Sequence, residues 1–238
     1  MEIVLPSALI RDSSPKSSFF ITLVEMTDAA RRSLEEIPKM HTMIHSGLTL
    51  QEYRAFLHDL YHIVWHFCPV MAAGAARCDD RFREVRYELY ERIEEEKGHE
   101  AWVLEDIEAV GGDVAGARAN PPSVPIQAMI AYNYHAAERV HPCSVLGMLY
   151  MLEVVSSVYA GRTSESIASA LRREVDAGGF KFLSSHSTLD ADHLAKLNVL
   201  IKKVDDPAAQ ESIVNSTRVN FFQFGQMFRE DGFTSLLG

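Results

Sequence analysis

A histidine-rich segment late in the chain, His186-Ser-Thr-Leu-Asp190-Ala-Asp-His193, carries the strongest chemical signal. On a helix, residues spaced four and seven apart lie along one face, so His186, Asp190 and His193 can point into the same space. Two imidazoles and a carboxylate form a ligand set that suits iron, manganese or zinc. The same short pattern also arises by chance on a solvated helix face, so by itself it leaves both interpretations open.

A single carboxylate, Glu153, interrupts an otherwise apolar helix predicted over residues 142–160. Burying a carboxylate without a partner is costly, so Glu153 needs a cation, a hydrogen-bonding group or metal ions beside it. The alternative to metal ions is a salt bridge to an arginine such as Arg139 or Arg162. In the metal interpretation, replacing Glu153 with alanine should not strongly destabilise the metal-free protein, because like charges around the site repel one another.

A third helix, predicted over residues 79–110, offers a carboxylate and an imidazole one turn apart. Most of its charged residues fit a solvated acidic face, but Trp102 and nearby apolar residues indicate that the helix also buries a face. His99 precedes Trp102 by three residues and therefore lies near the buried face. Glu95 and Glu96 both lie about one turn before His99, and spacing alone does not choose between them.

Together, these three helices can bring three carboxylates and three imidazoles to the centre of a helical bundle. Such a set suffices for two metal ions that carry out redox chemistry with dioxygen. The predicted metal ligands are Glu95, His99, Glu153, His186, Asp190 and His193.

Other histidines and aromatic residues follow helical spacing without completing a ligand set. The row His58, His62 and His66 has no carboxylate on its stripe, so we interpret it as a mixture of core and surface side chains. We predict a substrate pocket lined by His41, Tyr61, His62, Trp65, Tyr134 and Tyr150.

Composition restricts the class of protein. The chain has 238 residues, of which 47% are hydrophobic and 24% charged, an ordinary balance for a soluble globular protein. Its net charge of −10 and the lack of any Lys/Arg-rich run argue against nucleic-acid binding. The sequence contains neither a signal-peptide pattern nor a run of about 18 apolar residues, so we expect no membrane association. Three cysteines without paired spacing favour the reducing cytoplasm.

Helical periodicity runs through nearly the whole chain, and strand-like alternation is absent. Two prolines and a serine cluster predict an N-terminal arm over residues 1–16, followed by one domain over 17–238. We expect a single-domain all-α bundle of seven to eight helices, and the apolar content allows a homodimer. The predicted helices cover residues 17–37, 49–77, 79–110, 123–139, 142–160, 163–175, 180–203 and 207–229, and the clearest loop covers 113–122.

These motifs resemble those of the heme-oxygenase-like superfamily, whose members share an all-α fold and include heme oxygenases, thiaminase II and pyrroloquinoline-quinone synthase. They look most similar to its diiron oxidases, the iron-containing redox enzymes. In that group one helix carries Glu and His, a middle helix carries Glu, and His-x-x-x-Asp-x-x-His follows near the end. Residues 30–228 carry the pattern in the same order. Gly98 runs directly into His99, whereas several relatives have a longer interval, so Glu95 and Glu96 both stay candidates.

The resemblance implies a non-heme diiron, or iron–manganese, oxidase or oxygenase that activates dioxygen on a small-molecule substrate and takes electrons from a donor. It implies that Glu153 bridges the ions, that Glu95 and His99 hold one of them, and that the late segment holds the rest. No catalytic residue beyond the ligands is identified.

Two alternatives follow from sister families. One is a heme- or tetrapyrrole-binding or heme-degrading protein that uses His41, although Glu153 stands where heme oxygenases have a glycine-rich helix. The other is a thiaminase II-like or non-catalytic member. Pro142-Cys143 resembles the thiaminase cysteine, but residues 219–222 offer no matching glutamate.

Overall fold

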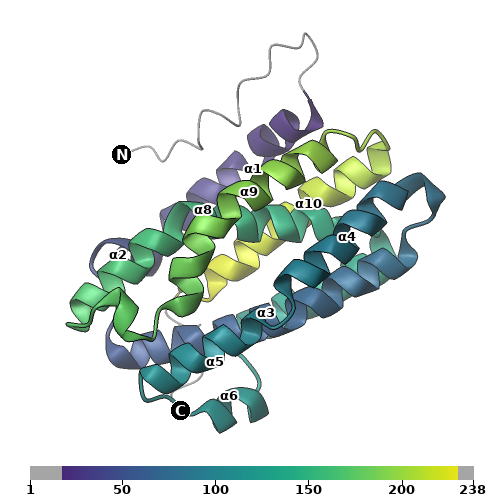
Figure 1. Cartoon of the computed structure of the whole chain (residues 1–238). Helices are drawn as coiled ribbons and strands as arrows, with labels where there is room; N and C mark the ends of the chain where they lie inside the picture. The colour runs from purple at the N-terminus through teal and green to yellow at the C-terminus, as the bar shows by residue number, and fades with distance from the viewer. Residues whose placement is uncertain (1–17, 230–238) are drawn as a thin grey trace.

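The computed structural model describes residues 18–229, apart from the side chains of residues 187–192. This part of the chain contains ten α-helices and no strand, which confirms the all-α prediction (Figure 1). The helices are α1 (Phe19–Glu35), α2 (Pro38–His45), α3 (Leu50–Arg77), α4 (Arg83–Glu96), α5 (His99–Ala109), α6 (Val114–Ala119), α7 (Val124–His135), α8 (Ser144–Ala170), α9 (Lys181–Ile201) and α10 (Pro207–Gln226).

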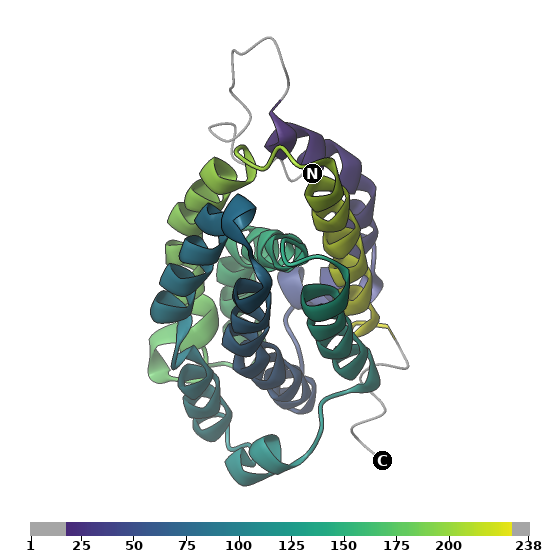
Figure 2. The same ribbon diagram turned by 90° about the vertical axis from the view of Figure 1, so that its right-hand side faces the viewer.

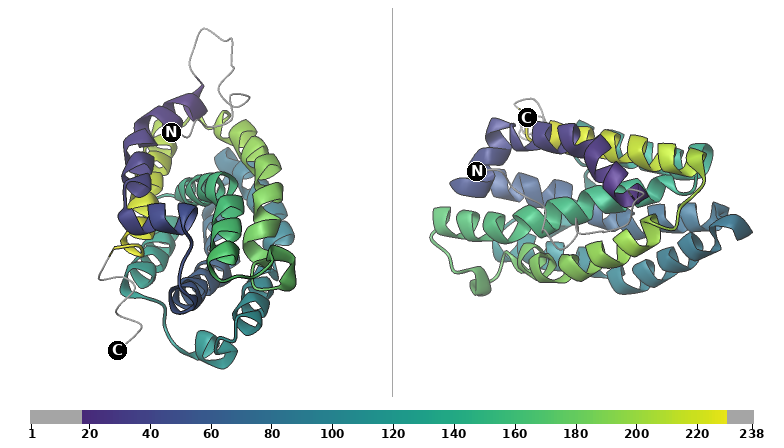
Figure 3. Two further views of the ribbon diagram at one scale, coloured as in Figure 1. Left: turned by 90° about the vertical axis from the view of Figure 1, so that its left-hand side faces the viewer. Right: turned by 90° about the horizontal axis from the view of Figure 1, so that it is seen from above.

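Helix α8 forms the centre of the bundle. Figure 2 looks nearly along its axis and shows the other long helices arranged around it, and Figure 3 shows that most of them run along one common direction. Its main neighbours are α9, α10 and α2. Among the described helices, α8 alone is long and apolar enough to cross a membrane, but 67% of its most apolar stretch is buried inside the protein. Its hydrophobicity is therefore that of a core helix.

The local sequence explains where α3 begins. Thr49 accepts a hydrogen bond from the backbone N–H of Glu52, and the Glu52 carboxylate accepts one from the backbone N–H of Thr49. This reciprocal capping box confirms the predicted helix start and satisfies two backbone donors that would otherwise lack partners.

The ten helices exceed the predicted seven to eight because α2, α6 and a break in the helix predicted over residues 79–110 were not predicted, whereas two other predicted segments form one helix. The helix predicted over residues 79–110 is divided between Glu96 and His99, where Gly98 adopts a left-handed φ of 93°. The loop predicted over 113–122 contains the short helix α6, which Asp113 caps at its N-terminus. Conversely, the segments predicted over 142–160 and 163–175 form one helix of 27 residues. The predicted arm over residues 1–16 lies outside the described residues.

Candidate metal centre

The break between α4 and α5 aims two predicted ligands at each other. Glu96 is the last residue of α4 and His99 the first of α5, and the left-handed Gly98 turns the chain between them. Glycine tolerates this backbone conformation because it has no Cβ. As a result, the Nδ1 atom of His99 lies 2.9 Å from Oε2 of Glu96.

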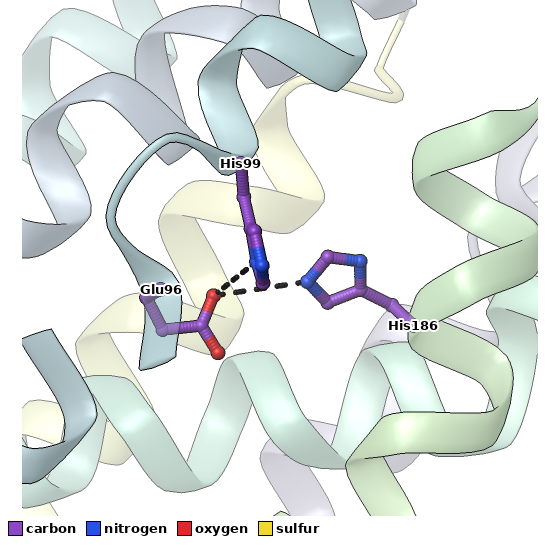
Figure 4. A group of neighbouring side chains, drawn as sticks. All are labelled: Glu96, His99 and His186. Carbon is purple, nitrogen blue, oxygen red and sulfur yellow. Dashed lines mark hydrogen bonds and ion pairs between the residues drawn. The ribbon is translucent and has the colours of Figure 1, made fainter. Parts of the chain in front are cut away.

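Helix α9 contributes the third member of the cluster. Nε2 of His186 lies 3.8 Å from the same Glu96 oxygen, and Figure 4 shows this carboxylate facing both imidazole rings. Nδ1 of His186 donates a hydrogen bond to the carbonyl of Phe182 at 3.0 Å. That bond fixes the ring and leaves the lone pair of the neutral tautomer on Nε2, which is how metal-binding histidines are commonly held.

The donor set fits a transition-metal ion. One ligand atom each from Glu96, His99 and His186 lies within 4.8 Å of the others. An ion bound at roughly 2 Å needs donor atoms roughly 3–4 Å apart, so small side-chain rotations would close the site. One carboxylate with two imidazoles suits iron, manganese or zinc.

Glu153 and His193 border the same space on the other side of Glu96. Nδ1 of His193 lies 3.6 Å from Oε1 of Glu96 and 3.7 Å from Oε1 of Glu153. The two oxygens of Glu96 thus face different histidines, Oε2 toward His99 and His186 and Oε1 toward His193. This arrangement suits a carboxylate that serves two adjacent ion positions.

Glu153 forms the salt bridge to an arginine that the sequence offered as the alternative to metal ions, but the arginine is Arg92 and not one of the two examples, Arg139 and Arg162. The Arg92 side chain is buried, and Nη1 donates to Oε1 of Glu153 at 2.7 Å. Nη2 donates to the carbonyl of His193 at 2.6 Å, and Nε donates to Glu88 at 3.3 Å. Arg92 lies one turn before Glu96, so both side chains point to the interior face of α4. The sequence analysis did not identify Arg92 as a partner of Glu153, and its spacing of four residues from Glu96 is the signal that could have placed it on the buried face.

The structure places Glu95 differently from Glu96. The Glu95 side chain is 36% exposed, and its Oε1 pairs with Nζ of Lys196 at 2.7 Å, while its Oε2 lies 3.7 Å from Nε2 of His193. Glu96 is buried and belongs to the three-residue cluster. Asp190 lies on α9 among the residues whose side chains are not described, so its predicted role stays a prediction.

Electrostatics keep the cluster carboxylate ionised. Burial raises the pKa of Glu96, but the neighbouring imidazoles of His186 and His99 outweigh this effect and hold the pKa at about 2. The pKa of Glu95 is also lowered, because its contacts with Lys196 and His193 outweigh partial burial. A charged carboxylate at Glu96 is the form that binds a metal ion.

A narrow apolar cavity of about 110 Å³ adjoins the cluster, and Glu96, Glu153 and His186 form part of its wall. It follows α8 from Glu153 to Thr163, a rise of about 15 Å at helical spacing. Among the described residues, no lysine or arginine lines it. Its apolar wall includes Phe56, Leu60, Ile63 and Phe67 of α3 and Leu152 and Ala160 of α8.

The six residues predicted to line a pocket lie elsewhere. Tyr61, His62 and Trp65 occupy other faces of α3 than the cavity-lining residues Leu60 and Ile63. His62 contacts the carbonyl of Asn120 at 3.0 Å, and Trp65 is 45% exposed. A side chain's position around the helix, rather than its aromatic character, decides whether it reaches the cavity.

The remaining three predicted pocket residues also have other contacts. His41 is exposed and packs against the ring of His45. The hydroxyl of Tyr134 contacts Nδ1 of His66 at 3.0 Å, and Tyr150 packs edge-on against Phe20. The cavity wall was missed because its apolar residues follow the helical spacing of any core stripe.

Cys143, the alternative nucleophile, is fully buried at the start of α8. Burial raises the pKa of its thiol far above the ordinary value. A thiol in this environment stays protonated at neutral pH and is a poor nucleophile.

Comparison with known proteins assigns the fold and a family. The model of a family described as iron-containing redox enzymes matches residues 54–220. No curated protein matches the chain.

Several solved structures share the fold. A domain of unknown function with a heme oxygenase-like fold from Shewanella denitrificans is 21% identical, with a TM-score of 0.80 over 94% of this chain and 95% of that one. A TenA homolog from Pseudomonas syringae is 16% identical, with a TM-score of 0.76 over 96% and 97% of the two chains. Heme oxygenase-1 from the cyanobacterium Synechocystis, in complex with heme, is 15% identical, with a TM-score of 0.73 over 93% and 96%.

Proposed function

This chain belongs to the family of iron-containing redox enzymes, and we propose that it is a non-heme oxidase or oxygenase that activates dioxygen on a small organic substrate. Its cofactor would be two iron ions, or one iron and one manganese ion. The observation that carries the proposal is the buried cluster of Glu96, His99 and His186 at the wall of an apolar cavity.

The proposal assigns the candidate ligands to two ion positions. Glu96, His99 and His186 hold the first ion, and Glu153 and His193 contribute to the second, with Asp190 as a further predicted ligand. Glu96 replaces Glu95 in this assignment, because it is buried and faces the histidines, whereas Glu95 pairs with Lys196. When bound, the ions supply the electrons and the binding position that dioxygen requires.

The cavity supports a substrate that inserts an uncharged, apolar part beside the ions. An apolar cavity of about 150 Å³ stays dry and binds benzene, so 110 Å³ accommodates a group of comparable or slightly smaller size. Its length along α8 favours a slender group over a broad one. An apolar wall also excludes water from the reacting atoms, which strengthens electrostatic interactions there. We place the reaction in the cytoplasm, and an external donor would supply further electrons.

The sister activities are supported by fold likeness, and a shared fold does not imply a shared function. Heme binding through His41 would use an exposed residue outside the cavity wall. A thiaminase II-like reaction through Cys143 would use a buried thiol of raised pKa. Neither has a residue cluster comparable to Glu96, His99 and His186 in its support.

Anaerobic titration with ferrous iron tests the proposal. We expect the wild-type protein to bind iron and then to consume dioxygen, whereas Glu96→Gln and His186→Ala should bind iron at least tenfold more weakly. Glu94→Gln on the same helix, where the side chain is 73% exposed, is the matched control and should bind normally. Unchanged iron binding in both cluster variants would refute the proposal. A Soret band after hemin addition that is lost in His41→Ala would favour the heme alternative.

A further inference from the structure

The side chains around Glu96 and those around Glu153 differ in charge. Glu96 faces three imidazoles, from His99, His186 and His193, at 2.9 to 3.8 Å. Glu153, by contrast, has the permanent positive charge of Arg92 at 2.7 Å from its Oε1. A neutral imidazole can become a metal ligand by supplying its lone pair, whereas a guanidinium has no lone pair to give.

Arg92 is held firmly where it lies. It is 1% exposed, and its guanidinium donates to Glu88, to Glu153 and to the carbonyl of His193. These contacts join α4 to α8 and α9, so the guanidinium cannot leave without breaking contacts on three helices. A metal ion approaching Glu153 therefore meets a fixed cation that already occupies one carboxylate oxygen and repels a second positive charge.

We propose that Arg92 competes with a metal ion for Glu153 and thereby makes the two ion positions unequal. The first ion binds tightly at Glu96, His99 and His186. The second binds beside Glu153 and His193 much more weakly, and it does so by sharing or displacing the Arg92 contact. This inference rests on the proposed metal-binding function and adds the order in which the positions fill and the residue that sets it.

If Arg92 instead supported the metal ligands, its removal would change metal affinity in the opposite direction. Residues that orient metal ligands from behind typically strengthen binding, and removing them weakens metal affinity by roughly 10–100-fold. A competing cation has the reverse effect, because its removal frees a carboxylate oxygen and removes repulsion. The direction of the change in the second binding step therefore separates the two roles.

Titration with Mn²⁺ in air, with free Mn²⁺ read by electron paramagnetic resonance, provides the measurement. The wild-type protein should bind in two steps, the second at least tenfold weaker than the first. In Arg92→Met the second step should tighten at least tenfold, while the first changes less than threefold. Arg92→Gln is a milder variant that keeps hydrogen-bonding capacity without charge, and it should shift the second step in the same direction. Circular dichroism checks that each variant is folded.

Arg31→Met is the matched control, since Arg31 is also largely buried and pairs with Asp28 and Glu35 on α1. It should leave both steps unchanged. Two equal binding steps in the wild-type protein, or a weaker second step in both Arg92 variants, would overturn this inference while leaving the metal site intact. Absence of any Mn²⁺ and iron binding would instead overturn the proposed function itself.

Discussion

Replacing Glu153 with alanine should destabilise the metal-free protein, because it would remove the nearer of the two carboxylates that pair with the buried guanidinium of Arg92. Breaking a buried ion pair by removing one partner costs about 3–5 kcal/mol. Arg92 would retain Glu88 at 3.3 Å and the His193 carbonyl at 2.6 Å, which places the expected loss near the lower limit of this range. For a protein of this size, about 3 kcal/mol corresponds to a drop in Tm of roughly 6–12 °C.

This expectation reverses the one drawn from the sequence alone. A set of carboxylates around an empty site would repel one another, so removing Glu153 was expected to be tolerated. The buried Arg92 reverses the expected effect on stability, because it already compensates the charge of Glu153 in the absence of metal.

Urea unfolding in the presence of a chelator, followed by circular dichroism, measures the effect. Glu165→Ala is the control, since it removes an exposed glutamate from the same helix, and it should change stability by less than about 0.5 kcal/mol. The double variant Arg92→Met with Glu153→Leu should recover stability to within about 1 kcal/mol of wild type, because it replaces the pair with apolar groups. Glu153→Ala protein as stable as wild type would refute the role assigned to the ion pair.

Three further predictions follow from the site and its surroundings. The neighbouring imidazoles of His186 and His99 outweigh burial and lower the folded-state pKa of Glu96 from 4.5 to about 2, so the ionised carboxylate stabilises the metal-free fold above pH 4.5 by on the order of 3 kcal/mol. That contribution is lost as the pH falls from 4.5 toward 2, so the stability gap between wild type and Glu96→Gln in urea unfolding should narrow over this range, and a constant gap would contradict the assignment. Ala160→Leu should fill the cavity and abolish the thermal stabilisation given by benzene without changing iron affinity by more than twofold; continued stabilisation by benzene would show that the compound binds elsewhere. Cys143 in the folded protein should resist iodoacetamide at pH 8, because burial raises its thiol pKa, and rapid alkylation detected by mass spectrometry would disprove its burial.

The fold could be predicted because its signals are local. Apolar residues at helical spacing and the Thr49–Glu52 capping box define α3, and both act within a few residues of one another. The division of residues 79–110 was not predicted, since a single glycine inside a charged helix is compatible with either continuation or a break. Only the packed structure shows that Gly98 adopts a left-handed φ and ends α4.

The choice between Glu95 and Glu96 depended on that break. On a continuous helix, both residues lie about one turn before His99, so spacing could not separate them. The turn at Gly98 moves His99 onto a new helix axis and brings it against Glu96, while Glu95 turns toward Lys196. Arg92 was missed for a related reason, because its partner Glu153 is 61 residues away in the chain.

Anomalous diffraction at the iron edge, from crystals grown with ferrous iron under anaerobic conditions, tests the central claim most directly. We predict a strong anomalous peak at roughly 2 Å from ligand atoms of Glu96, His99 and His186. A second, weaker peak should lie beside Glu153 and His193. An iron-loaded crystal with no peak at Glu96, His99 and His186, or with peaks only elsewhere in the bundle, would contradict the account.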